Sequence, residues 1–251
     1  MGRFAAVLGR ERRARGLAFL GLFALLVVYY ELAGGLWHET IWWHVAWLDL
    51  VLMPAVFALV LIALPLRTAR GLLAVGLAFA VLAAVLTIAN VDVFANFARL
   101  AAATLIAWWF LGYFETVAWV VLVASIIPWV DAYSVFFGPT KTIVNKHAHV
   151  FDVLSFAFAV PGGGAFQLGV PDLLFFALFL AAAARFGLRV YATWFGLVAM
   201  LGLTIALTIW LEINGLPALP GIALGFLLPN ADLLWRLRGR QVSDTPARQE
   251  A

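Results

Sequence analysis

The chain has 251 residues, of which 65% are hydrophobic and 12% are charged, and its formal net charge is +3. Soluble domains contain roughly 45–50% apolar and about 25% charged residues. This composition therefore excludes a soluble enzyme and a disordered protein, because too few polar side chains remain to cover a water-facing surface.

Eight apolar runs follow one another along the chain, most of them close to the roughly 20 residues that a membrane-spanning helix needs. The runs are continuous and not alternating, which argues against a β-barrel. We therefore expect an all-α polytopic membrane protein with about eight transmembrane helices. The expected spans are residues 16–37, 45–66, 71–91, 97–113, 116–137, 166–186, 190–211 and 217–235.

Basic residues flank alternate ends of these spans. With the arginine-rich segment 1–15 inside, the arginines after spans two, six and eight also fall inside, as the positive-inside rule requires. Only Lys141 and Lys146 depart from this pattern. We predict a multi-pass protein of the inner cell membrane with both termini in the cytoplasm, and a disordered cytoplasmic tail at 239–251. The inner arginines are Arg67, Arg70, Arg185, Arg189, Arg236, Arg238 and Arg240.

Two aspartates fall deep inside expected spans, where an ionisable side chain is costly and indicates function. With a rise of about 1.5 Å per residue, Asp131 lies roughly 24 Å and Asp172 roughly 20 Å from the inner ends of their spans. These spans are consecutive and antiparallel, so the two carboxylates could face each other. Glu31 and Asp49 lie near the outer ends of the first two spans, where interfacial solvation or a hydrogen bond between helices explains them.

Asp172 also has a structural explanation. It follows Pro171, and an acidic residue just after proline is common in the first turn of a helix. A helix starting at Pro171 would leave only about fourteen apolar residues before Arg185, which is too few to span. We therefore expect the span to begin near Phe166, with Pro171 as an interruption and Asp172 inside the membrane.

Paired carboxylates would carry acid–base chemistry. In a low dielectric two neighbouring carboxylates cannot both ionise easily, so they share a proton. One can then activate water as a general base while the other protonates a leaving group. Glycine and proline breaks at 169–171 and 216–220 lie at the same depth and predict a shared cavity. Peptide hydrolysis by a pair of aspartates needs these two roles, and a proton-coupled transporter can use the same chemistry, so the pair alone does not decide between them.

Three short motifs, in order, resemble the presenilin and signal peptide peptidase family of intramembrane aspartyl proteases. Asp131 resembles the first catalytic aspartate of that family. The family's Gly-x-Gly-Asp corresponds to Gly169-Val170-Pro171-Asp172, and its Pro-Ala-Leu motif is present as Pro217-Ala218-Leu219. The resemblance covers about residues 116–235. Val130 and Pro171 stand where the family has tyrosine and glycine, and the family has nine spans.

The resemblance implies an endopeptidase that cleaves within transmembrane segments of single-span proteins or remnant signal peptides. A four-helix region at 16–114 would precede a catalytic region at 115–238. The unwound substrate would pair as an edge strand, with partners near 158–161 and 217–219. The implied partners are these substrates, the lipid bilayer and a possible second copy of the chain, with no cofactor and no nucleic acid. The implied catalytic residues are Asp131 and Asp172, supported by Gly169, Pro171, Tyr133, Pro217, Ala218 and Leu219.

Other interpretations stay open. A proton-coupled transporter also uses broken helices and midplane aspartates, although we find no matching pair of breaks in two halves of the chain. A catalytically impaired relative that binds membrane helices fits Pro171, because proline fixes φ and lacks an N–H. His147, His149 and Asp152 resemble a partial metal site, but two histidines and one carboxylate make an incomplete ligand set, and we expect no metal.

Overall fold

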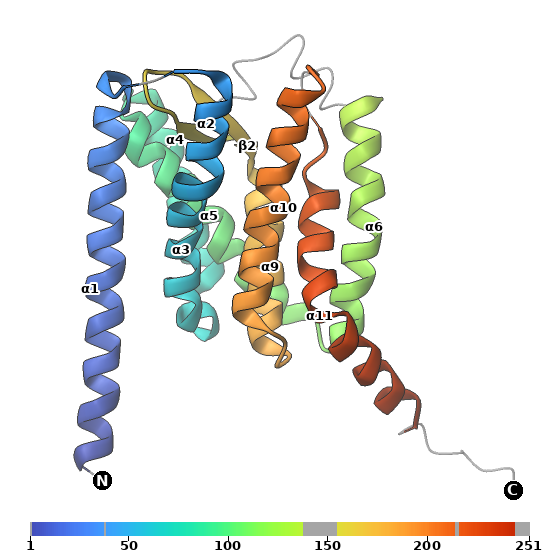
Figure 1. The fold of residues 1–251 in the computed structure, drawn as a ribbon. Helices are drawn as coiled ribbons and strands as arrows, with labels where there is room; N and C mark the ends of the chain where they lie inside the picture. The colour runs from blue at the N-terminus through green and yellow to red at the C-terminus, as the bar shows by residue number, and fades with distance from the viewer. Residues whose placement is uncertain (1, 38, 138–154, 214–215, 244–251) are drawn as a thin grey trace, which may run out of the picture.

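The computed structural model describes residues 2–37, 39–137, 155–213 and 216–243, and they are mostly helical. Most helices run up and down along a common direction, and α1 (Gly2–Leu32) begins at the same end of the bundle at which α11 (Leu219–Ser243) ends (Figure 1). We call this the inner end and the opposite one the outer end. Among the described residues, five helices are long and apolar enough to cross a membrane. These are Glu11–Gly35, Ile41–Thr68, Asp92–Tyr113, Val117–Val135 and Val190–Trp210.

The first two expected spans are helical, but the second changes helix type along its length. Pro54 has no N–H to donate to the preceding turn, and a π-helical turn lies directly before α3, in which Pro54 sits. Thr40 caps the start of this span by accepting a hydrogen bond from the Trp43 N–H at 3.3 Å. The elements are α1 (Gly2–Leu32), η1 (Ala33–Gly35), α2 (Ile41–Trp47), η2 (Leu48–Leu52), α3 (Met53–Ala63) and η3 (Leu64–Thr68).

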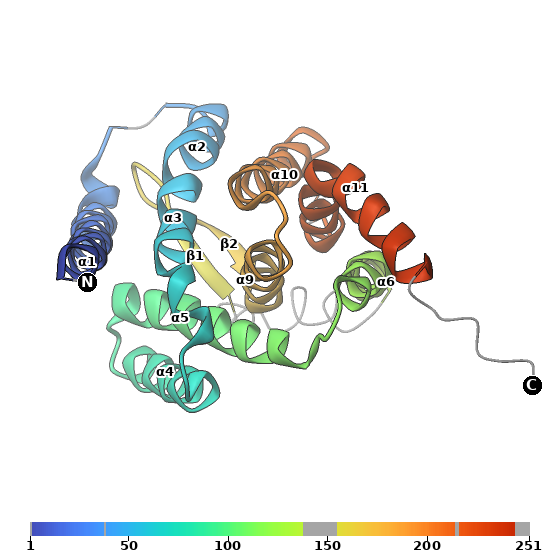
Figure 2. The same cartoon turned by 90° about the horizontal axis from the view of Figure 1, so that it is seen from below.

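An antiparallel pair follows, formed by α4 (Leu72–Ile88) and α5 (Asp92–Phe110), and α5 continues as the 3-10 turn η4 (Leu111–Tyr113). The pair packs closely because Gly76 has no side chain. A Cβ there would lie 2.9 Å from Cγ1 of Ile106. On its other side α5 packs against α9 (Val170–Arg185) (Figure 2).

A β-hairpin stands where we expected the sixth span to begin. After α6 (Val117–Phe136), the described chain resumes as β1 (Ser155–Ala159) and β2 (Ala165–Gly169), which pair antiparallel. The three glycines at 162–164 turn the hairpin with φ values of +79°, +96° and +91°, which glycine adopts without strain. The expected helical start near Phe166 is therefore wrong, because α9 (Val170–Arg185) begins only at Val170.

The hairpin resolves the length problem of this span. Sixteen helical residues in α9 cover roughly 24 Å, and the five residues of β2 add about 3.3 Å each. Non-helical backbone at membrane depth is tolerated where it is buried in protein or lines a wet cavity. Strand β1 is mostly buried and packs against α5, whereas β2 is buried only at Leu168. Helix α9 lies in the middle of the bundle (Figure 2). It carries a continuous run of fully buried side chains, and the ring of Phe176 stacks on that of Phe57 in α3 with centroids 3.9 Å apart.

The last two helices, α10 (Val190–Trp210) and α11 (Leu219–Ser243), touch backbone to backbone. A Cβ on Gly196 would lie 2.5 Å from the carbonyl oxygen of Gly225, so both glycines are required. Pro229 lies inside α11, whose lower part angles away from the bundle (Figure 1). Because α11 reaches Ser243, the tail that we expected to be disordered from residue 239 is helical up to there. Residues 244–251 lie outside the described part.

Candidate active site

Asp131 lies near the outer end of α6 and reaches across to the beginning of α11. Its Oδ2 accepts a hydrogen bond from the Leu219 N–H at 3.0 Å, and the Ala218 N–H is a second donor. The first N–H groups of a helix have no partner within the helix. Asp131 therefore caps α11 from a neighbouring helix, and the half-buried Pro217 and Ala218 hold the chain that enters this cap.

Asp172 is the third residue of α9 and caps its own helix. Its carboxylate accepts a hydrogen bond from the backbone of Gly169, the residue before the helix. A Cβ on Gly169 would lie 3.2 Å from Oδ2 of Asp172, so the missing side chain leaves room for the carboxylate. This arrangement is half of a capping box, in which a third-position acid reaches back to the residue that caps the helix.

Pro171 starts α9 and does not interrupt it, so our expectation on this residue is wrong. It occupies the second position of the helix, where its missing N–H would have no partner in any case. The carbonyl of Gln167, four residues before Pro171, belongs to β2 and not to a helix, so the proline breaks no helical hydrogen bond there. Proline therefore fits the backbone at this position without distorting it.

The two aspartates are brought together. Helices α6, α9 and α11 pack on one another, and the charge of Asp131 acts on Asp172. Both side chains are half-buried. Two like charges near each other add no stability, so capping alone explains the position of each carboxylate but not their proximity.

Tyr133 does not join the pair. It is two residues beyond Asp131 on the same helix, a spacing that points the two side chains in different directions. Its ring packs against Phe137 with centroids 6.1 Å apart, and 67% of the residue is exposed.

The sequence did not reveal how the hairpin is held. Asn96 of α5, 3% exposed, pairs with Ala157 as a neighbouring strand would: its Nδ2 donates to the carbonyl at 2.7 Å, and its Oδ1 accepts from the N–H at 2.8 Å. Tyr30 also donates to the Ala157 carbonyl, Tyr29 to that of Ala159 and Arg99 to that of Ser155. Polar side chains in apolar spans were the signal that could have found this cradle.

The two other acids singled out by sequence lie apart from this pair. Glu31 is exposed, which agrees with interfacial solvation. Asp49 sits in the π-helical turn and faces α10, where a Cβ on Gly202 would lie 2.9 Å from its carboxylate carbon. Its Oδ1 is buried and has no hydrogen-bond partner in the described part of the chain.

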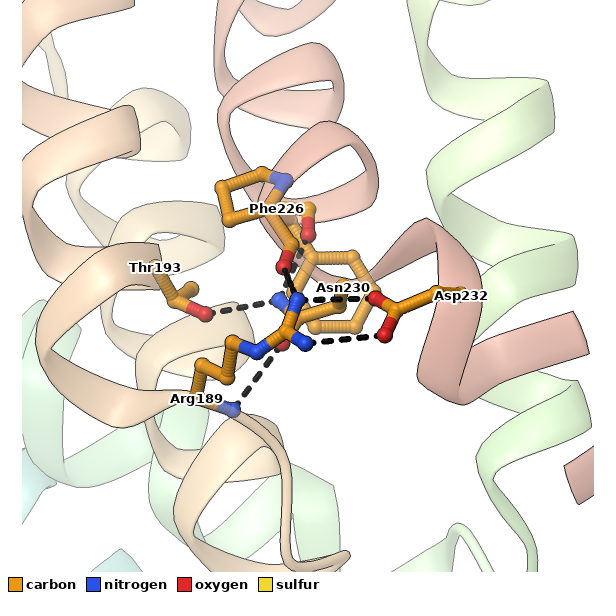
Figure 3. A network of polar contacts seen from close by, with 6 residues as sticks. Arg189, Thr193, Phe226, Asn230 and Asp232 are labelled. Carbon is orange, nitrogen blue, oxygen red and sulfur yellow. Dashed lines mark hydrogen bonds and ion pairs between the residues drawn. The ribbon is translucent and has the colours of Figure 1, made fainter. Parts of the chain in front are cut away.

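A second polar cluster joins α10 to α11 at the inner end (Figure 3). Asn230 is fully buried; its Nδ2 donates to Thr193 at 2.7 Å and to the Phe226 carbonyl at 2.8 Å, and its Oδ1 accepts from the Arg189 N–H at 3.0 Å. The Arg189 side chain forms an exposed bidentate pair with Asp232. Every polar group of Asn230 has a partner here, so this cluster fastens two helices.

The described residues include no group of three or more His, Asp or Glu side chains placed to hold a metal. His147, His149 and Asp152 lie outside the described residues. Comparison with protein-family models gives no match, and comparison with curated protein sequences gives none either.

Proposed function

We propose that the protein is an intramembrane aspartyl protease of the presenilin and signal peptide peptidase type. One observation carries the proposal: Asp131 and Asp172, forty-one residues apart in sequence, interact where α6, α9 and α11 meet. The Pro217–Leu219 motif supports it, because its backbone N–H groups bind one of the two carboxylates.

The proposed reaction is the hydrolysis of a peptide bond. One carboxylate takes a proton from water as the water oxygen attacks the peptide carbonyl carbon, and the other protonates the leaving nitrogen. The carbon–nitrogen bond then breaks, giving a carboxylic acid and an amine. The N–H donors on Asp131 and Asp172 orient both carboxylates for these roles, and no cofactor takes part.

The substrate would approach along β2. We expected the substrate strand to pair with the chain near residues 158–161. The edge of β1 that faces away from β2 is, however, covered by Tyr29, Tyr30 and Asn96. Strand β2 leads directly into Gly169 and Asp172. An unwound transmembrane segment added along β2 would therefore bring its backbone to the carboxylates, with main-chain pairing giving affinity independent of sequence. Single-span proteins and remnant signal peptides are the substrates that fit this route.

We propose that the protein lies in the inner cell membrane and that the inner end of its bundle faces the cytoplasm. The chain that follows α3, the end of α9 and the end of α11 lie at that end together with the start of α1 (Figure 1), and these segments carry Arg67, Arg185 and Arg236. The positive-inside rule then places both termini in the cytoplasm. Reporter fusions after Arg240 should be active on the cytoplasmic side only.

The central test uses purified protein and a tagged single-span substrate. We expect Asp131→Asn and Asp172→Asn each to lower the cleavage rate by about 100-fold or more, since asparagine cannot transfer the proton. Asp49→Asn is the matched control, because it neutralises another half-buried carboxylate in the same membrane region. Equal losses in all three variants would argue against the proposal.

A helix-binding protein without activity is the second candidate, because each aspartate already has a structural role as a helix cap. In that case the folded wild-type protein would retain a single-span segment without cutting it. Proton-driven uptake into vesicles, abolished by Asp172→Asn, would instead support the transporter.

A further inference from the structure

We infer that the inner end of the bundle holds a binding site for a phosphate group, between η3, the end of α5 and the end of α9. A cavity of about 250 Å³ lies there, lined by Arg67, Thr68, Trp108, Leu111, Gly112 and Arg185. One water molecule takes up about 30 Å³ of liquid, so the cavity has room for a phosphate group together with several waters.

The cavity holds two positive charges and no negative one. Arg67 and Arg185 both line it, and none of the described lining residues is acidic. Arg67 donates to the carbonyls of Leu64 at 3.3 Å and Ala184 at 3.5 Å, and Arg185 donates to the carbonyl of Leu111. These bonds cap helix ends. A guanidinium has five N–H donors, so each arginine keeps donors for an anion.

Trp108 supplies an independent sign of a missing acceptor. The residue is only 3% exposed and lines the cavity, and among the described residues its Nε1–H has no hydrogen-bond partner. The Nε1 atom is closed to water in this conformation, so the indole must turn toward the cavity before it can donate to an anion. Buried donors are almost always paired. Helix capping accounts for the arginines alone, whereas an anion in the cavity would serve both guanidinium groups and the indole. Phosphate suits such a site because its oxygens accept several charge-assisted hydrogen bonds at once.

The location favours a phospholipid headgroup as the source of the phosphate. Arg185, Thr68 and Gly112 are exposed, so the cavity opens at the inner end of the bundle. Basic pockets between helices on the cytoplasmic side bind anionic headgroups. This site is independent of the proposed protease activity, since it lies at the opposite end of α9 from Asp172.

The test is calorimetric titration of the purified full-length protein in a detergent and a buffer that both lack phosphate. Short-chain phosphatidylglycerol is compared with glycerol 3-phosphate, with inorganic phosphate and with the matching diacylglycerol, which has no phosphate. We expect phosphatidylglycerol to bind, and Arg67→Gln with Arg185→Gln to weaken binding about tenfold or more. Trp108→Phe, which removes only the N–H donor and keeps an aromatic ring, should weaken it about threefold.

Arg70→Gln is the matched control, because Arg70 is exposed near Arg67 and does not line the cavity. It should bind as wild type does. If free phosphate binds as tightly as the lipid, the site stands and its ligand comes from water. If diacylglycerol binds as well as phosphatidylglycerol, or if neither the arginine pair nor Trp108→Phe weakens binding, the inference is overturned. Circular dichroism of each variant separates lost binding from lost fold.

Discussion

The two ends of the bundle are built by the same rule with opposite charge. At the outer end, acidic side chains meet the beginnings of helices: Asp172 at α9 and Asp131 at α11. At the inner end, Arg67 and Arg185 meet the ends of helices. The helix dipole favours both arrangements.

Capping does not explain why the like charges gather in pairs. Each carboxylate would cap its helix equally well alone, and so would each arginine. Two like charges in one place lower stability, and strained or repulsive arrangements of this kind cluster where a protein acts. The position of each charge therefore follows from the helix ends, whereas its pairing with a like charge is what supports the proposed reaction at the outer end and the proposed phosphate site at the inner end.

The largest effect on the cleavage rate is expected at Gly169, because its missing side chain leaves room for the carboxylate of Asp172. In Gly169→Ala the new methyl would lie 3.2 Å from Oδ2 of Asp172, and the carboxylate would have to move by a few tenths of an ångström. Because a misplacement of about 1 Å in a reacting group can cost about 100-fold in rate, we expect this smaller shift to cost about tenfold. Cleavage of a tagged single-span substrate measures this. Gly35→Ala, at the same end with nothing within 4 Å of its Cβ, should cleave as wild type does.

Two buried asparagines give the next test, one at each end. Asn96→Leu leaves the N–H and carbonyl of Ala157 without their amide partner, and Asn230→Leu removes the amide bonds to Thr193 and Arg189. Unsatisfied buried groups cost about 1–3 kcal/mol each, so thermal unfolding should show a similar destabilisation for both variants.

Cleavage at a temperature where both variants stay folded then separates the ends. Of the two variants, only Asn96→Leu should lose activity, because Asn96 binds the hairpin that leads to Asp172 and Asn230 does not. Equal activity in both folded variants would show that the hairpin does not position the site.

A smaller effect is expected at Pro171. Replacing proline by glycine gives the unfolded chain more freedom, so Pro171→Gly should lower the free energy of unfolding by about 0.4–1 kcal/mol. Cleavage should be at least as fast as in wild type, since position two of α9 needs no N–H. Loss of activity in a variant that stays folded would instead show that the Pro171 ring helps to position the active site.

The smallest effect is expected for the pair of Arg189 and Asp232 at the inner end, whose side chains are 50% and 46% exposed. Exposed ion pairs contribute little and are screened by salt. Asp232→Asn should leave the melting temperature nearly unchanged at high ionic strength, and cleavage unaffected. A large, salt-independent loss of stability would mean that this pair does more than join two exposed side chains.

The sequence predicted the helical membrane class and the approximate bounds of most helices, because lipid demands local apolar runs of fixed length. It also singled out both aspartates, because a charge within an apolar run is visible without any structure, and it named Gly169 through the resemblance of residues 169–172 to a family motif. The prediction of a helix failed at residues 166–169, which form part of β2. The short, largely apolar sequence there fits the start of a helical span as well as it fits a strand. Periodicity does not separate short apolar strands from buried helix segments.

Only the tertiary structure decided which residues that are distant in the sequence contact one another. The Leu219 N–H reaches Asp131 across 88 positions, and Asn96 replaces a strand neighbour for Ala157 across 61. Arg67 and Arg185, which the sequence used only to orient the chain, share a cavity with Trp108. Apolar run length is a local property that each helix must satisfy alone. The partner of a polar group depends on which helices pack together, and in this chain close glycine contacts such as Gly196 with Gly225 set part of that packing.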